Sequence, residues 1–142
     1  AQATPEEMAA IGMLPVVYGA YPNDQFYWVG QDAPVITATE VTINYTATPK
    51  DITQLKSQMT SQVNQSAYTI LLPSDWMVVK AFETSTKVPT SWNTWRANVR
   101  TTATNVVSMI EAAPDVAIVE GVMSNINWPK DPDQVAASLV SE

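Results

Sequence analysis

Residues 48–63, TPKDITQLKSQMTSQV, decide the fold class of the chain. Thr48, Pro49 and Asp51 form a helix start, because a hydroxyl caps free N–H groups, proline suits the first turn and a carboxylate complements the positive helix end. Apolar residues then recur every three or four positions, at Ile52, Leu55, Met59 and Val63. The pattern predicts an amphipathic helix with one buried stripe and one wet face.

Further helices are expected on the C-terminal side. Pro73 interrupts the run 68–72, after which Ser74 or Asp75 can cap a short helix that ends near Glu83. A longer helix starts at VPTS, residues 88–91, and one of its sides carries Trp92, Trp95, Val99, Thr102, Val106 and Met109 or Ile110.

Pro114 and Asp115 end this long helix. Residues 116–126 predict one more helix before NWP, residues 127–129, turns extended. The acidic tail, residues 130–142, is expected to be loose or at most to form a short helix capped by Asp133.

The N-terminal part has a different texture, rich in β-branched and aromatic residues. TPEE at residues 4–7 predicts a short helix that ends at Gly12. Residues 14–18 and 25–29 flank YPND, residues 21–24, which suits a turn, so we expect a loose hairpin there.

A third strand is expected where apolar and polar residues alternate, at Val41, Ile43 and Tyr45 against Thr42, Asn44 and Thr46. The sequence therefore predicts an α+β fold. Its parts are a β-rich region over residues 1–48, a helical region over residues 49–129 and the acidic tail over residues 130–142.

Composition excludes much of enzyme chemistry. The 142 residues are 46% apolar and 15% charged, enough for a folded core, and they include no Cys and no His. Thiol nucleophiles, Ser-His-Asp triads, disulfides and metal sites built on these residues are thus excluded. The carboxylate pairs, Glu6 with Glu7 and Asp131 with Asp133, fall at a helix start and in the tail, where acids normally face solvent. We expect no enzyme, no metal and no cofactor.

Charge is unevenly distributed along the chain, whose formal net charge is −7. Residues 1–49 hold five acids and no base, residues 50–110 hold six bases and three acids, and residues 111–142 hold one base and six acids. Such a chain repels phosphate backbones, so we expect no nucleic-acid partner. No long apolar run and no signal-peptide pattern is present, so we expect a cytosolic origin and no membrane partner.

Aromatic side chains are the unusual feature of the β-rich region. Trp and Tyr are enriched in binding hot spots, so this cluster is the candidate partner-binding surface. Tyr27 and Trp28 point to opposite faces of a strand, so one of them is expected to be exposed. The candidate residues are Tyr21, Phe26, Tyr27 and Trp28.

Two arginines on the long helix have a structural interpretation. Arg96 and Arg100 lie four residues apart on one face, and we expect one or both to pair with Asp75 and Glu83 of the preceding helix. Trp76 and Trp95 are expected to fill the helical core. An acidic segment of another protein is the alternative partner for the arginines.

Three segments together resemble a known family: LLPSDW at residues 71–76, WNTWRANVR at 92–100 and NWP at 127–129. In this order they are similar to the tail assembly chaperone and tail-fibre-associated proteins of tailed bacteriophages. The front of the chain, residues 4–17, is also similar to such proteins. The family usually has a short loop where residues 101–126 form helices here. The matching residues, expected to be structural, are Asp75, Trp76, Trp95, Arg96, Arg100, Trp128 and Pro129.

The resemblance implies a non-enzymatic protein that binds a phage tail or tail-fibre protein. One class of function is an assembly chaperone or adaptor that acts in the host cytoplasm. A second class is a minor structural subunit that stays in the virion tail, baseplate or fibre. From the residues alone, a carbohydrate-binding module using Trp28 and Tyr27 is a third class, and a homo-oligomer such as a trimer would match the symmetry of a fibre.

Overall fold

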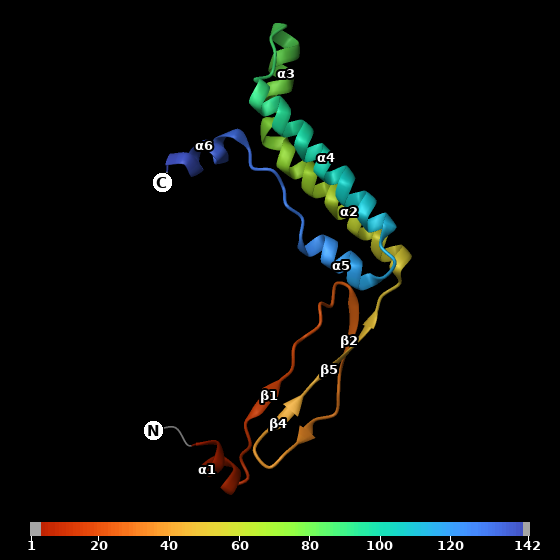
Figure 1. Cartoon of the computed structure of the whole chain (residues 1–142), viewed down its shortest axis with the longest axis vertical. Coiled ribbons are helices and arrows are strands. Elements are labelled where there is room, and N and C mark those ends of the chain that lie inside the picture. Colours follow the sequence, from red (N-terminus) through yellow and green to blue (C-terminus); the bar gives the residue numbers. More distant parts are fainter. Residues whose placement is uncertain (1–3, 141–142) are drawn as a thin grey trace. The chain divides into compact units, whose positions relative to one another are not determined.

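The computed structural model describes residues 4–140 and divides the chain into two compact units. The first, Ala1–Asp51, carries all the strands and is called the β unit here; the second, Ile52–Glu142, is called the helical unit. Figure 1 shows the strands followed by the helices along the chain. The expected α+β fold class is confirmed.

The β unit begins with helix α1, Pro5–Ala10, and contains two small sheets. Thr4 and Glu7 form the reciprocal cap of α1: the Glu7 amide donates to Thr4 Oγ1 at 3.2 Å and the Thr4 amide to Glu7 Oε2 at 2.8 Å. Gly12, at φ +78°, follows the end of α1 as expected. The five strands are β1 Val16–Tyr18, β2 Tyr27–Gln31, β3 Val35–Ile36, β4 Val41–Ile43 and β5 Tyr45–Pro49.

The strand pairing differs from the expected hairpin. β1 pairs in parallel with β4, which also pairs with β3, and β2 pairs antiparallel with β5 over five residue pairs. The turn lies about two residues later than expected, at residues 23–27, where the amides of Phe26 and Tyr27 donate to Asn23 O at 3.0 and 3.1 Å. After this turn β2 pairs with β5 over five residue pairs, and β1 pairs with β4 instead of β2.

The expected third strand is divided at Asn44 into β4 and β5, which lie in different sheets. Gly19 allows this crossing, because its amide donates to Ile43 O at 2.8 Å and a Cβ there would lie 2.5 Å from Asn44 Oδ1. The alternation does not bury one face, since all three residues of β4 are half-buried. Among the side chains described in residues 4–51, only Phe26 is buried.

The helical unit is built on two long helices, α2 Ile52–Leu71 and α4 Thr90–Ala112, which lie side by side in Figure 1. A 3-10 turn, η1 Leu72–Ser74, links α2 to α3, Asp75–Thr84, and α5, Val116–Ser124, packs on both long helices. α2 begins later than expected because Thr48 and Pro49 pair with β2. No helix within residues 4–140 is both long and apolar enough to span a bilayer.

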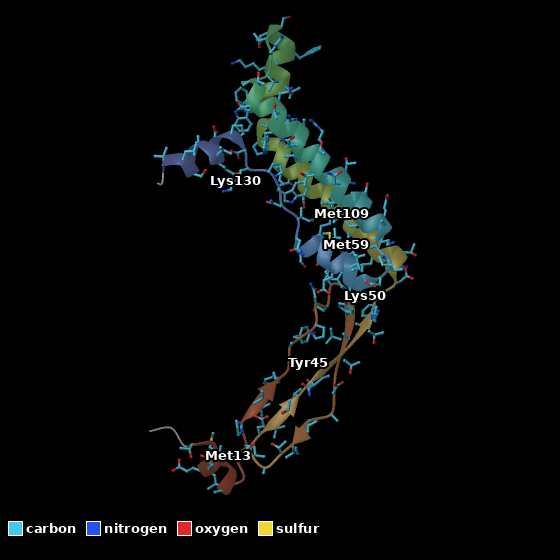
Figure 2. The ribbon with its side chains drawn as sticks, viewed as in Figure 1. Met13, Tyr45, Lys50, Met59, Met109 and Lys130 are labelled. Atoms are coloured by element: carbon cyan, nitrogen blue, oxygen red, sulfur yellow. The ribbon has the colours of Figure 1, made fainter. Side chains whose placement is uncertain are left out.

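The core of the helical unit follows the expected stripes. Met59 is fully buried along the α2–α4 contact (Figure 2). On α4 the side chain of Met109 is 55% exposed, and Ile110 takes the core position instead. The buried apolar residues of the unit are Leu55, Met59, Val63, Ala67, Trp95, Val99, Ala103, Val106, Ile110, Ala113, Val116 and Val119.

The acidic tail contains a helix, α6, Pro132–Val140, which is the short helix given as the alternative to a loose tail. Asp131 caps this helix, in place of the expected Asp133: Asp131 Oδ1 accepts from the Gln134 amide at 2.8 Å and Gln134 Oε1 accepts from the Asp131 amide at 3.2 Å. This reciprocal pair satisfies N-terminal groups that the tail would otherwise leave to water. The tail lacks any buried side chain over its described residues 133–140.

Candidate functional site

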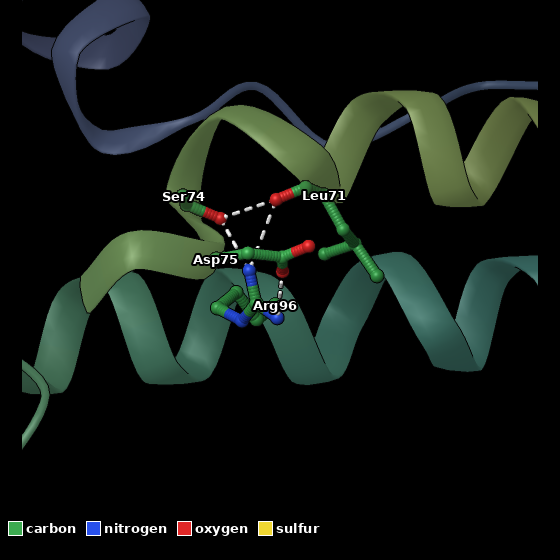
Figure 3. A network of polar contacts seen from close by, with 4 residues as sticks. All are labelled: Leu71, Ser74, Asp75 and Arg96. Carbon is green, nitrogen blue, oxygen red and sulfur yellow. Dashed lines mark hydrogen bonds and ion pairs between the residues drawn. The ribbon is translucent and has the colours of Figure 1, made fainter. Parts of the chain in front are cut away.

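A polar network centred on Arg96 joins α4 to the junction of α2 and α3 (Figure 3). Nη2 of Arg96 donates to Asp75 Oδ1 at 2.7 Å, and Nη1 donates to Leu71 O at 3.0 Å and to Ser74 Oγ. The Ser74 hydroxyl in turn donates to Leu71 O at 2.8 Å. These four residues, Leu71, Ser74, Asp75 and Arg96, are called the Arg96 network.

The chain break at Pro73 explains why the guanidinium fits here. Proline cannot donate to the preceding turn, so α2 ends with carbonyl groups that need a donor. Arg96 supplies that donor to the negative end of α2, and its fork also reaches the carboxylate in the first turn of α3. Arg96 is 6% exposed, whereas the side chain of Asp75 is 45% exposed.

The pairing expected of the two arginines is confirmed for Arg96 with Asp75. Arg100 is exposed, and among the described residues neither Asp75 nor Glu83 forms an ion pair with it. Arg100 lies one turn of α4 after Arg96, the residue that contacts the α2–α3 junction. Ser74 is a partner in the network and makes no side-chain cap of α3.

Trp95 brings the third resembling segment into the same region. Its Nε1 donates to Pro129 O at 2.9 Å, and its ring meets Trp92 edge-on with the ring centres 5.4 Å apart. Trp95 is 7% exposed, as expected for a core residue, while Trp128 and Pro129 are half-buried. Two adjacent residues of α4 therefore contact the other two resembling segments. Arg96 binds residues 71–76, and Trp95 binds residues 127–129.

Trp76 does not fill the core as expected. Its side chain is 57% exposed, and Lys80 Nζ lies 5.9 Å from its ring centre. The 3-10 turn at residues 72–74 has three residues per turn, so it shifts the rotational phase of α3 relative to the buried stripe of α2. α3 consequently buries none of its side chains.

The aromatic residues of the β unit include Trp28 on β2, which is 67% exposed. Lys50 Nζ lies 4.8 Å from the Trp28 ring centre and donates to Asp24 O, while Tyr21 meets Tyr45 edge-on at 5.0 Å (Lys50 and Tyr45 are labelled in Figure 2). Of the expected residues, Tyr21 is 61% exposed, Tyr27 is half-buried and Phe26 is buried. The register places Thr48 opposite Trp28 and Tyr45 opposite Gln31, so Tyr27 and Tyr45 lie on the other face of this strand pair from Trp28. We call Trp28 with its neighbour Lys50 the Trp28 surface.

Sequence reasoning missed Lys50 beside Trp28 and Tyr45 beside Tyr21. Lys50 follows the end of β5, where the register Trp28 to Thr48 brings it near Trp28, whereas Tyr45 begins β5 opposite Gln31. A signal for Lys50 was present, because it is the one basic residue before position 56. A positive charge beside an aromatic strand is a recurrent pair.

Large apolar side chains on the three-stranded sheet are also uncovered. All residues of β1 and β3 are exposed, which means that neither face of these strands is packed within the chain. Larger contiguous apolar exposure of this kind marks interaction surfaces. The exposed residues are Val16, Val17, Tyr18, Val35 and Ile36.

Within residues 4–140 no group of three or more His, Cys, Asp or Glu side chains is arranged to hold a metal ion. The two features that carry an argument are thus the Arg96 network with Trp95, and the Trp28 surface with the uncovered strands. No family model, curated protein or solved structure matches the chain.

Proposed function

We propose that the chain is a non-enzymatic protein that binds a tail or tail-fibre protein of a tailed bacteriophage, as an assembly chaperone or adaptor. The proposal combines the family resemblance of residues 71–76, 92–100 and 127–129 with the uncovered apolar surface of the β unit. The first points to the class of protein, and the second to the part that makes the contact.

The observation that carries the proposal is the meeting of the three resembling segments. They are separated by up to about fifty residues in the chain, yet Arg96 and Trp95 hydrogen-bond to the other two segments directly. Residues that recur together in a family for a structural reason are expected to touch in this way. The contacts support the resemblance as one of fold.

The β unit supports a role in protein association. It has one buried side chain among those described and exposes apolar residues on both faces of β1 and β3. Small sheets without a packed face are marginal in water, so a partner that covers them would stabilise the unit as well as bind it. Trp28, with its neighbouring Lys50, is the expected anchor of that contact.

Retention in the virion as a minor tail, baseplate or fibre subunit is the alternative within the same class. A carbohydrate-binding module is less well supported, because Tyr27 is half-buried and leaves Trp28 alone as a flat platform. A glycan array probed with the full chain separates this alternative, since oligosaccharide binding that is lost in W28A would favour it.

The experiment is affinity purification of the tagged full chain from phage-infected cells, followed by lysine cross-linking and mass spectrometry. A tail or tail-fibre protein should copurify and cross-link to Lys50, the single lysine of the β unit. The same protein quantified in purified virions separates the roles. A fixed ratio to the tail tube protein indicates a structural subunit, and absence from virions indicates a chaperone.

The matched control is a second exposed tryptophan beside a lysine, Trp76 with Lys80, in the helical unit. W28A should weaken recovery of the partner at least about tenfold, because a central tryptophan typically contributes 2 kcal/mol or more, whereas W76A should not. Both variants should melt like the parent. Recovery of no tail or fibre protein would refute the proposal, and equal recovery with W28A would refute the assigned surface.

A further inference from the structure

α3 and the start of α4 enclose an apolar cleft with a positive rim. Two adjoining hollows share Ala81, Thr86 and Lys87; one extends to Trp76 and Lys80, and the other to Phe82 and Val88. Phe82 is 89% exposed. Lysines line both hollows, and none of the described lining residues is acidic. We call this feature the α3 cleft.

The C-terminal helix α6 has the complementary chemistry. Its first turn carries Asp133, while Val135 and Leu139 lie four residues apart on one apolar face. Leu139 is 73% exposed and Val140 is 86% exposed, whereas Val135, at 46%, lies nearer to α4. The segment 131–142 holds three acids and no base. α6 is thus an acidic amphipathic helix whose C-terminal apolar residues, Leu139 and Val140, are exposed.

The chain's own α6 does not occupy its α3 cleft. The bond from Trp95 to Pro129 tethers the segment before α6, and Val135 lines a hollow together with Ser91 and Thr94 of α4. The α3 cleft is lined instead by Thr90 and Asn93, on a different face of the same first turns.

We propose that the α3 cleft binds α6 of a second copy of this chain, so that two copies exchange their C-terminal helices across a two-fold axis. Apolar residues of α6 fill the hollow between Trp76 and Phe82, and Asp133 faces Lys80 and Lys87. The tether and the α3 cleft both lie on the first turns of α4, so the proposed dimer brings these turns of the two copies together. The exchange doubles the buried area, which one short helix would leave below the roughly 1,200 Å² of a stable interface.

This inference is independent of the phage partner, because it involves α3, α4 and α6 and not the Trp28 surface. Its test is sedimentation velocity of the full chain from about 1 µM to about 300 µM, the range expected for an interface of this size. The expected result is a reversible monomer–dimer equilibrium. L139D should raise the dissociation constant at least about tenfold, because it places a charge in the apolar hollow. I118D, at an apolar site on α5 that is 48% exposed, is the control and should leave it unchanged.

A charge exchange tests the partner segment directly. The K80E/K87E variant and the D133K variant should each sediment as monomers, because like charges then meet in every cleft. An equimolar mixture should recover the dimer, since each cleft now meets an α6 of opposite charge. Circular dichroism checks that each variant keeps its helices, and L139D remains decisive if one charge variant does not fold.

A parent chain that stays monomeric throughout this range would overturn the proposal. A dimer that is insensitive to L139D would overturn it too, because the contact would then lie elsewhere, for example on the uncovered strands. Failure of the folded charge variants to recover the dimer on mixing would exclude α6 as the occupant of the α3 cleft.

Discussion

Replacing Arg96 with alanine should destabilise the helical unit more than any other change to an exposed or charged residue of α4. The side chain is 6% exposed and donates to Leu71 O, Ser74 Oγ and Asp75 Oδ1. Its loss removes one of the two donors to Leu71 O at the end of α2 and leaves the Ser74 hydroxyl as the other. α4 would then be fastened to the α2–α3 junction by apolar contacts alone.

The size of the effect follows from these contacts. Three hydrogen bonds at about 1 kcal/mol each set the scale, and the Asp75 contribution is reduced because water can solvate a carboxylate that is 45% exposed. The buried aliphatic stem of Arg96 adds about 1 kcal/mol of lost packing. We expect R96A to lower the free energy of unfolding by about 2–4 kcal/mol, or the melting temperature by about 10–20 °C.

Urea and thermal unfolding, followed by circular dichroism at 222 nm, measure this change. R100A, one turn further along α4, is the matched control, and its effect should stay within about 0.5 kcal/mol because Arg100 is exposed. R96K should recover less than half of the loss, since an ammonium group lacks the planar fork. An R96A effect equal to that of R100A would refute the reasoning.

Three further changes test other contacts of the helical unit. W95F removes the donor to Pro129 O and should cost about 1–2 kcal/mol in urea unfolding, with no loss expected if that hydrogen bond contributes nothing. M59A leaves a cavity at a fully buried site and should cost about 2–5 kcal/mol; a cost below 1 kcal/mol would mean that the α2–α4 contact is loosely packed. D115A removes the cap that accepts from the Ile118 amide at 2.9 Å and should cost about 1 kcal/mol, whereas D115N should retain most of it.

The helical unit could be predicted from the sequence because its signals are local. The spacing of Leu55, Met59 and Val63 and the breaks at Pro73 and Pro114 depend on neighbours within a few residues. Strand pairing depends on residues that are far apart in the sequence. No local pattern therefore indicated that β2 would pair with β5 and not with the strand before it. The capping box at Asp131 was readable from Gln134 three residues later, and it was overlooked in favour of Asp133.

Among the candidate residues, the position of a side chain could be predicted only where its chemical groups required particular partners. The guanidinium group of Arg96 can donate to several acceptors around the break at Pro73. Arg100 has the same side chain but is exposed. Trp76 and Trp95 have equal hydrophobicity, and the phase shift at the 3-10 turn separated them. This rotation depends on the backbone conformation of residues 72–74, and the spacing of apolar residues in the sequence does not reveal it.

Because the β unit has a single buried side chain among those described, we expect its strands to open more often than the helices α2 and α4. Amide protons of β1 and β3 should exchange with deuterium through small local openings, while those of α2 and α4 around Met59 exchange only when the helical unit unfolds. Any molecule that covers these strands will therefore slow exchange there first and leave the helical amides as they were. The exchange rates of the β1 and β3 amides therefore report whether a partner covers these strands.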